Sequence, residues 1–350
     1  MPFTPHPPFN QEALPVPLQG SAHQIRTVEA HDADDHAHNL TAWEQSYDQI
    51  TRGPFHGVLT ELQMPEMQVF LEHTSQAVRQ SCCVWPDAFW FGVQGQASHA
   101  CGRSGGDARI NGRLGGADTI MVRPGNREFE LLTPADYAIY GIVIRRDFLA
   151  ATASRMGCCI DWTQLASTEV LHVAESTRLA CLQALVRLIL ADRDDAEDGE
   201  DGEDRPVAGV AHAGQAVMMA VLSMLDTGAV DSAVSNSFMR RQRIVAQVRD
   251  HVLAHRDRLV TVPELCERLH VSRRTLQYCF EDVLGISPIQ YLRIIRLNGA
   301  RRELRESFPE SRTVRDVAAD WGFWHFSQFS SDYRKLFGQS PSESLRQRTH

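Results

Sequence analysis

The 350-residue sequence contains a single lysine, Lys335, so arginine carries nearly all of its positive charge. This bias is most simply one of codon usage and indicates no function. No apolar run reaches the ~18 residues of a membrane-spanning helix, and the Pro-rich start lacks the basic and apolar regions of a secretory signal. The eight cysteines form no CxxC motif and no disulfide-framework spacing, which favours thiols in a reducing cytosol. We therefore expect a cytoplasmic protein with no membrane partner.

The sequence also lacks the motifs of common enzymes. The Gly-rich stretch 97–118 contains no GxxxxGK[ST] phosphate-binding motif, and we interpret it as loops. The only HxH pair, His36 and His38, lies before the first expected strand, whereas a cupin-type metal site needs it on a barrel strand. No Ser/His/Asp or paired-carboxylate signature is present. We expect no catalytic residue, no metal site and no enzyme activity, and keep a metal-dependent cupin-type enzyme fused to a DNA-binding module as the alternative from another class.

Charge divides the chain into two parts. Residues 240–350 contain 20 Lys and Arg against 13 Asp and Glu, a net charge of +7. The rest contains 15 basic against 31 acidic residues, a net charge of −16. Such an asymmetry fits a basic nucleic-acid-binding module attached to an acidic sensor.

The segment 261–280 has the pattern of a helix-turn-helix. Thr261 can cap a helix, with Glu264 at the capping-box spacing, and Ser272 can cap a second helix after a break at His270. The second helix is predicted to bury Leu276, Cys279 and Phe280 and to present polar side chains to a DNA major groove. The candidate DNA contacts are Arg273, Arg274, Thr275, Gln277 and Tyr278. Spacing alone does not say which of the two arginines reads a base.

The segment 313–337 repeats this pattern. Thr313 can cap its first helix, and Trp321-Gly322 can end it. Inward positions of the second helix are Phe326, Phe329, Tyr333 and Phe337, and the candidate DNA contacts are His325, Ser327, Gln328, Ser331, Arg334 and Lys335. The predicted connecting helix, 288–307, would be ~28 Å long, which suits two recognition helices about one DNA turn, ~34 Å, apart. One chain could then occupy two successive major grooves.

These residues carry a family resemblance. The runs LGISPIQYLRIIRLNGARREL (284–304), WGFWHFSQF and FGQSP resemble the AraC/XylS family of transcriptional regulators. The resemblance implies double-stranded DNA at promoter sites and RNA polymerase as partners. A helical bundle without a DNA role is the alternative.

The N-terminal part is predicted to be β-rich. Residues 1–38 are expected to be disordered, and HDADDHAH (31–38) to be a solvated polar run rather than a metal site. The stretch 40–50 is expected to be a helix that packs Trp43 and Tyr47 on the sheet. The lesser alternative is that these two side chains line a ligand-binding site. From 55 to 144, short runs of branched and aromatic residues predict about eight strands in a barrel or jelly roll.

Helices are expected at 146–158, 175–192 and 213–226. The helix at 175–192 has an apolar stripe, which either packs in the core or forms a homodimer face. Its members are Leu179, Leu182, Val186, Ile189 and Leu190. The stretch 192–206 contains nine acidic residues and is expected to be a mobile loop. The fold class is α+β. The expected domains are a disordered segment (1–38), a β-barrel-like effector-sensing domain with flanking helices (39–227), a linker (228–237) and an all-α DNA-binding domain with two helix-turn-helix units (238–350).

The sensor half carries a narrower resemblance. TAWEQSYDQI, FHGVLTEL, QVFLEHTSQAVRQSCCVWPDAFWFGV and RPGNREFELLTPADY resemble the regulators of ethanolamine-utilisation operons, although 97–118 and 192–206 depart from them. The resemblance implies an activator that responds to ethanolamine and adenosylcobalamin together. Aromatic faces and a carboxylate can hold the ethanolamine cation; the candidates Trp85, Phe89, Trp90 and Glu128 could equally be core. No Asp-x-His-x-x-Gly motif for a corrinoid is present. An AraC-type regulator of a different small effector is the alternative.

Overall fold

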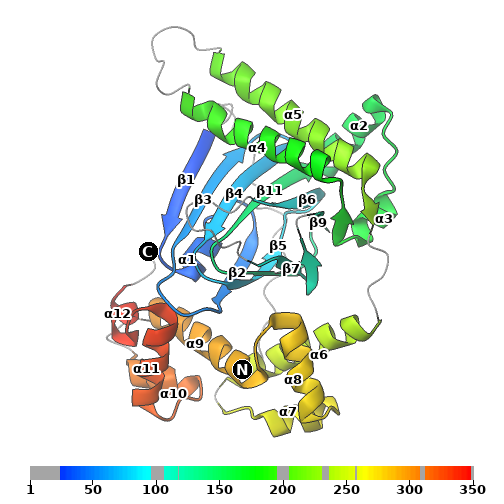
Figure 1. The fold of residues 1–350 in the computed structure, drawn as a ribbon. Helices are drawn as coiled ribbons and strands as arrows, with labels where there is room; N and C mark the ends of the chain where they lie inside the picture. Colours follow the sequence, from blue (N-terminus) through cyan, green and yellow to red (C-terminus); the bar gives the residue numbers. More distant parts are fainter. Residues whose placement is uncertain are drawn as a thin grey trace.

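The computed structural model describes residues 24–95, 106–116, 118–194, 205–230, 236–256, 258–307 and 312–347. A β-rich N-terminal part lies against a helical C-terminal part, and two long helices cover the far side of the larger sheet (Figure 1). The acidic stretch 195–204 and most of the Gly-rich loop between 96 and 105 lie outside the described residues.

The strands form two antiparallel sheets. The first has eight strands in the order β1-β3-β4-β11-β6-β9-β12-β13: β1 (Gln24–Ala30), β3 (Gly57–Gln63), β4 (Met67–Thr74), β6 (Ala88–Gln94), β9 (Thr119–Pro124), β11 (Tyr137–Arg145), β12 (Val170–His172) and β13 (Ala229–Val230). The second has five in the order β2-β5-β10-β7-β8: β2 (Glu44–Gln49), β5 (Val78–Cys83), β7 (Ala108–Ile110), β8 (Arg113–Gly115) and β10 (Phe129–Thr133).

The expected closed barrel is therefore wrong for the described residues. The second sheet ends at β2 and at the three-residue strand β8, and neither end pairs with an edge of the first sheet. The two sheets instead pack face to face around a shared apolar cluster, to which Phe70, Trp90 and Met121 contribute from the first sheet and Phe129 and Leu131 from the second. β10 alternates with period 2: it buries Phe129 and Leu131 and leaves Glu130 half-buried.

The other face of the large sheet packs on helices. These are α2 (Arg146–Met156), α3 (Trp162–Ser167), α4 (Glu175–Asp194) and α5 (Arg205–Thr227), with α4 and α5 side by side (Figure 1). The buried face of α4 contains Cys181, Leu182, Leu185 and Leu188. Of the predicted stripe, Val186 and Leu190 lie outside this face and are 39% and 44% exposed.

Two predictions for the first fifty residues are wrong. Residues within the expected disordered segment form β1 and α1 (Ala33–Ala37), and the run 31–38 is not solvated, since Asp32 and His36 are 3% and 2% exposed. The expected helix at 40–50 is β2, because this segment pairs with β5 along its whole length, from Glu44 opposite Cys83 to Gln49 opposite Val78. Long-range pairing overrides the local pattern here.

The C-terminal part contains α6 (Asn236–Ala254), α7 (Val262–Leu269), α8 (Arg273–Leu284), α9 (Pro288–Glu306), α10 (Val314–Asp320), α11 (Phe326–Phe337) and α12 (Pro341–Arg346). Within the expected linker, Ala229–Val230 forms β13 and α6 begins at Asn236. Two apolar clusters lie at the two ends of α9: α6 to α8 pack on its first half, and α10 to α12 on its second half (Figure 1).

The contact of α9 with α10 gives a first prediction. A Cβ at Gly299 would overlap the indole ring of Trp321, so the Gly299→Ala variant should unfold more easily, by about 1–3 kcal/mol. Urea unfolding checks this. Gly209→Ala in α5 is the matched control, because nothing lies within 4 Å of its added methyl group. Alanine should stabilise that helix by about 0.5–1 kcal/mol. Equal stabilisation by both changes would contradict the close approach of Gly299 and Trp321.

Candidate nucleic-acid interface and its contact with the β-rich part

The α7–α8 pair is positioned by its caps. The Thr261 hydroxyl accepts from the Glu264 N–H, and the Ser272 hydroxyl accepts from the Thr275 N–H at 3.1 Å. The predicted capping box is only half formed, because the Glu264 carboxylate accepts from Arg258 and lies 3.0 Å from Nε2 of His251 instead. These hydrogen bonds, chiefly that from Arg258, lower the pKa of Glu264 to about 2.

The structure leaves the predicted contact face of α8 accessible. Leu276, Cys279 and Phe280 are buried as expected. Arg273, Arg274, Thr275 and Tyr278 are exposed. Gln277 is half-buried and donates to Oε1 of Glu281 at 2.6 Å. The guanidinium of Arg241 lies 5.3 Å from the centre of the Tyr278 ring, which fixes that ring at the edge of the face.

The α10–α11 pair has the same arrangement. Thr313 and Asp316 form a complete capping box, and Gly322 has the left-handed φ of +73° that ends α10. Phe329, Tyr333 and Phe337 are buried as expected, but Phe326 is 40% exposed and does not face inward. The six predicted contact residues are all exposed: His325, Ser327, Gln328, Ser331, Arg334 and Lys335.

One exposed aromatic residue escaped the sequence analysis. Trp324 precedes the α11 N-cap, His325, and is 70% exposed. Together with Phe326, it places two aromatic side chains beside the predicted contact face. Both aromatic residues are present in the run WGFWHF. Helical periodicity does not indicate that Trp324 is exposed, because this residue lies in the turn before α11.

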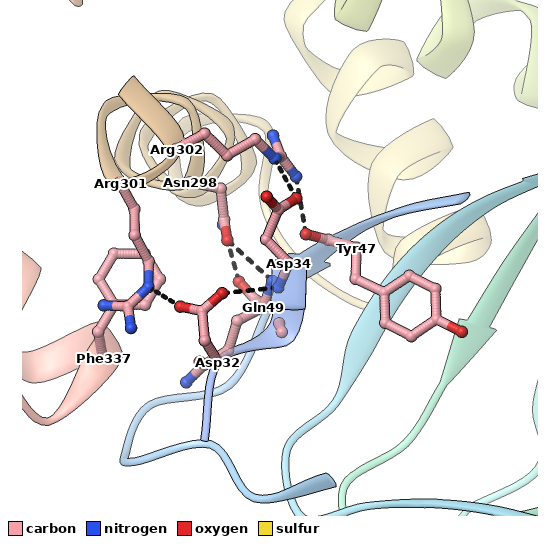
Figure 2. Close-up of a pocket in the computed structure, with 9 residues that line it drawn as sticks. Asp32, Asp34, Tyr47, Gln49, Asn298, Arg301, Arg302 and Phe337 are labelled. Atoms are coloured by element: carbon pink, nitrogen blue, oxygen red, sulfur yellow. Dashed lines mark hydrogen bonds and ion pairs between the residues drawn. The ribbon is translucent and has the colours of Figure 1, made fainter. Parts of the chain in front are cut away.

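The connecting helix α9 contacts the β-rich part through three arginines, Arg301, Arg302 and Arg305, which we call the arginine ladder. Figure 2 shows Arg301 and Arg302. Their partners are carboxylates of α1, its N-cap and β2. Arg301 pairs with Asp32, Arg302 with Asp34 (2.9 Å) and Asp48 (2.6 Å), and Arg305 with Asp32 (2.9 Å) and Asp35 (2.6 Å). Charges of opposite sign thus meet where the β-rich part and the helical part touch.

The electrostatics of Asp32 follow from this contact. Burial alone would raise the pKa of its carboxyl, but the positive charges of Arg301 and Arg305 hold the pKa below its usual range. Because the folded pKa is below the unfolded one, the pairing contributes stability at neutral pH. That contribution is lost as the pH falls through the folded pKa.

Backbone contacts join the same surfaces. The Gln49 N–H donates to Oδ1 of Asn298 at 2.9 Å, and the Asn298 amide donates back to the Gln49 carbonyl at 3.0 Å. The Gln49 side chain donates to the Leu336 carbonyl at 2.7 Å (Figure 2 shows Gln49 and Asn298). Ile50 and Ala77 pack on Ile294 of α9. The end of β2 is therefore held by α9 and by the end of α11.

A small cavity, with room for about one water molecule, lies between the two sheets. We call it the inter-sheet chamber; its lining is Trp43, Gln45, Tyr47, Phe70, Glu72, Gln80, Cys82, Trp90, Phe129, Leu131 and Ile139. Of the four candidate effector residues, only Trp90 belongs to it. Phe89 points to the opposite face and packs on Trp162, Glu128 is exposed, and Trp85 is half-buried near Gln68.

Two other kinds of site are absent from the described ranges. No group of three or more His, Cys, Asp and Glu side chains in them could hold a metal ion. Within the same ranges, no helix has the length and apolarity that crossing a membrane requires.

Comparison with known proteins locates the likeness in the helical part. Residues 265–347 match the family model of the helix-turn-helix domain. Over 103 residues, or 29% of this chain, the sequence is 40% identical to a probable thc operon regulatory protein of Rhodococcus erythropolis, covering 31% of it. Over 128 residues, or 37% of this chain, it is 30% identical to XylDLEGF operon transcriptional activator 3 of Pseudomonas putida, covering 38% of it. The chain thus spans 31% and 38% of the length of these two curated relatives.

A solved structure is similar to part of this chain. The crystal structure of a probable AraC family transcriptional regulator from Rhodopseudomonas palustris is 32% identical over 31% of this chain and 99% of that chain, with a TM-score of 0.28. Residues 265–347 are thus similar to the helix-turn-helix domain of known transcriptional regulators.

Proposed function

We propose that this protein is a sequence-specific transcriptional activator that binds promoter DNA through two helix-turn-helix units, α7–α8 and α10–α11. The observation that carries the proposal is the exposure of the predicted contact side chains on two helices at opposite ends of α9. The 19 residues of α9 correspond to ~28 Å, a length that suits adjacent major grooves. RNA polymerase is the expected partner at the promoter.

The effector proposal rests on the resemblance to ethanolamine-utilisation regulators. We take ethanolamine as the small-molecule effector, with a different small effector as the alternative. Adenosylcobalamin, the second effector that the resemblance implies, fits neither the inter-sheet chamber nor the small cavity between Tyr47 and Arg302, because a corrinoid is far larger than both. A homodimer is a further proposal, for which the exposed Val186 and Leu190 of α4 offer an apolar surface.

The docked arrangement suggests how an effector could act. We propose that the arginine ladder and its carboxylates restrain the DNA-binding part, and that the effector releases or reorients it. An effector can shift this equilibrium only by its differential affinity for the two states.

Base reading by α8 is a testable consequence. Arg274→Ala and Gln277→Ala should each lose about 1–3 kcal/mol of discrimination between the specific site and random DNA, because either side chain can make a bidentate base contact. Competitive gel shifts on the two DNAs measure this. Gln277 must release Glu281 to make such a contact.

Arg268→Ala is the matched control, since Arg268 is an exposed arginine on the neighbouring helix α7. It should weaken binding to both DNAs alike or not at all. If Arg274→Ala and Gln277→Ala also weakened both DNAs equally, these residues would contact only phosphates.

Restraint by the sensor is a second consequence. The double variant Asp34→Asn/Asp48→Asn removes both carboxylates paired with Arg302 while leaving the DNA-binding part unchanged. We expect effector-free DNA binding to strengthen about 5- to 30-fold, the equivalent of about 1–2 kcal/mol. Fluorescence anisotropy with labelled promoter DNA measures it, and Asp147→Asn, which affects an exposed carboxylate paired locally with Arg145, should change nothing.

The fragment 236–350 tests the same idea from the other side. Without the sensor, it should bind DNA at least as tightly as the effector-free whole protein. Much weaker binding by the fragment would show that the sensor mainly supplies dimerisation, so that two DNA-binding parts engage adjacent half-sites together.

A further inference from the structure

A short loop that connects α6 with α7 lies where the two helix-turn-helix units meet. We call it the junction loop; its described residues are His255, Arg256, Arg258 and Leu259. Arg296, near the middle of α9, donates to the Arg258 carbonyl at 3.1 Å. A Cβ at Gly322, in the turn of the second unit, would lie 3.4 Å from the Arg258 carbonyl carbon and 3.7 Å from the Arg256 carbonyl oxygen. The junction loop therefore contacts both α9 and the second unit.

The junction loop lies on the side of α9 that faces away from the β-rich part. Arg296 precedes Asn298, which contacts Gln49 of β2, by two residues. Two residues of an α-helix correspond to a rotation of ~200°, so the Arg296 side chain leaves α9 opposite that contact. Arg256 and Leu259 are both exposed. The contact with the β-rich part therefore leaves these two side chains accessible.

Positive charge is concentrated at the junction loop. Arg258 pairs with Glu264 of α7, but no carboxylate among the described residues pairs with Arg256 or Arg296. Arg296 is 4% exposed, and its Nε has no hydrogen-bond partner among the described residues. Burial lowers the pKa of Arg296, and the positive charge of Arg258 lowers it further. Because like charges repel at this range, an anion beside the junction loop would be stabilised.

Arg256 is the member of this group that a large ligand can reach. Its guanidinium lies over the Trp321 ring, 5.8 Å from the ring centre, and this stacking restricts the side chain to the junction. Leu259, three residues further along, is 56% exposed. An accessible guanidinium and an exposed apolar side chain on one short loop suit a ligand surface that combines negative potential with apolar walls. The minor groove of DNA is such a surface.

The corresponding loop of the second unit has its arginine engaged. Thr261 and Thr313 are the equivalent N-caps of α7 and α10. Arg312, directly before Thr313, pairs with Glu303 at 2.8 Å and with Asp320. Glu303 belongs to the last turn of α9, far from the first unit. The arginine that no described carboxylate engages is therefore on the loop between the two units.

The proposed DNA complex places the junction loop opposite a minor groove. If α8 and α11 occupy successive major grooves, ~34 Å apart on one face of the duplex, a minor groove faces the protein halfway between them. Arg296, which holds the junction loop, lies near the middle of α9 and so midway between the two units. A narrow, A·T-rich minor groove has an enhanced negative potential that attracts arginine.

We propose that Arg256 and Leu259 contact the minor groove of the DNA spacer between the two major-groove sites. Arg256 donates to the acceptors N3 of adenine and O2 of thymine, whereas the amino group of guanine obstructs this contact. The protein thereby favours A·T pairs in a spacer that neither recognition helix contacts. This deepens the proposed function and rests on it, because it adds a minor-groove determinant of specificity to the same interface.

The test begins with the sequences that the full-length protein enriches from a random DNA duplex library. They should contain two half-sites about one DNA turn apart, with an A·T-rich spacer between them. The spacer of the best duplex is then replaced by G·C pairs or by inosine·cytosine pairs. Inosine lacks the amino group of guanine, so its pair with cytosine combines the minor groove of A·T with the major groove of G·C. Fluorescence anisotropy measures binding of the wild-type protein to the three duplexes.

The G·C spacer should weaken binding at least about 5-fold, and the inosine·cytosine spacer less than about 2-fold. Arg256→Ala should bind the A·T and G·C spacers within about 2-fold of each other, because it lacks the side chain that distinguishes them. Arg315→Ala is the matched control, since Arg315 is an exposed arginine on α10. This control should retain the full preference for the A·T spacer.

The inosine measurement needs only the wild-type protein and does not depend on the folding of any variant. Equal binding of all three spacers, an inosine·cytosine spacer as weak as the G·C spacer, or an unchanged spacer preference in Arg256→Ala would overturn the minor-groove contact. The library separates this inference from the proposed function. Enriched half-sites without a spacer effect overturn the inference alone, whereas no enrichment of half-sites overturns the proposed function.

Discussion

Three arginines on α9, one buried and two partly buried, constrain the whole arrangement. Arg301, Arg302 and Arg305 follow one another along one side of a helix whose two ends carry the two helix pairs. A guanidinium taken out of water must meet a carboxylate or a carbonyl, and here the partners are Asp32, Asp34, Asp35, Asp48 and the Tyr47 carbonyl. All of these belong to α1, its N-cap or β2. Moving the helical part away would therefore leave both sides of the contact without partners until water replaced them.

The overall charges of the two parts are a poor guide to this interaction. A net charge of −16 facing +7 suggests diffuse attraction, but salt screens charges over ~8 Å under physiological conditions. The specific contribution comes from a few close pairs together with the two-way hydrogen bonding of Gln49 and Asn298. Buried ion pairs add little net stability and lose much when one partner is removed. Such a contact therefore suits two parts that exchange between two arrangements better than two parts that are held permanently in one.

The features that could be predicted correctly from the sequence are those that depend on interactions within one helix. The caps Ser272 and Thr313 and the buried positions Phe280 and Phe329 follow from spacing within one helix, and the structure places them as expected. The predictions for the first fifty residues failed because the partners of these residues are remote in sequence. Asp34 pairs with Arg302, 268 residues away, and β2 forms because β5 pairs with it. The four candidate effector residues do not line one cavity, for another reason. Phe89 and Trp90 are adjacent on a strand, so period 2 already sends them to opposite faces.

The strand β2 explains why two separate features of this protein belong together. Its side chains divide between two environments: Gln45 and Tyr47 line the inter-sheet chamber, whereas Asp48 and Gln49 contact α9. β2 is also an edge strand of its sheet, paired only with β5 among the described strands. An edge strand can shift with fewer broken hydrogen bonds than a central one, since only one side is paired. Asp48, which pairs with Arg302, directly follows Tyr47 on this strand. A change in the position of Tyr47 in the inter-sheet chamber therefore also moves Asp48 and its contact with the arginine ladder.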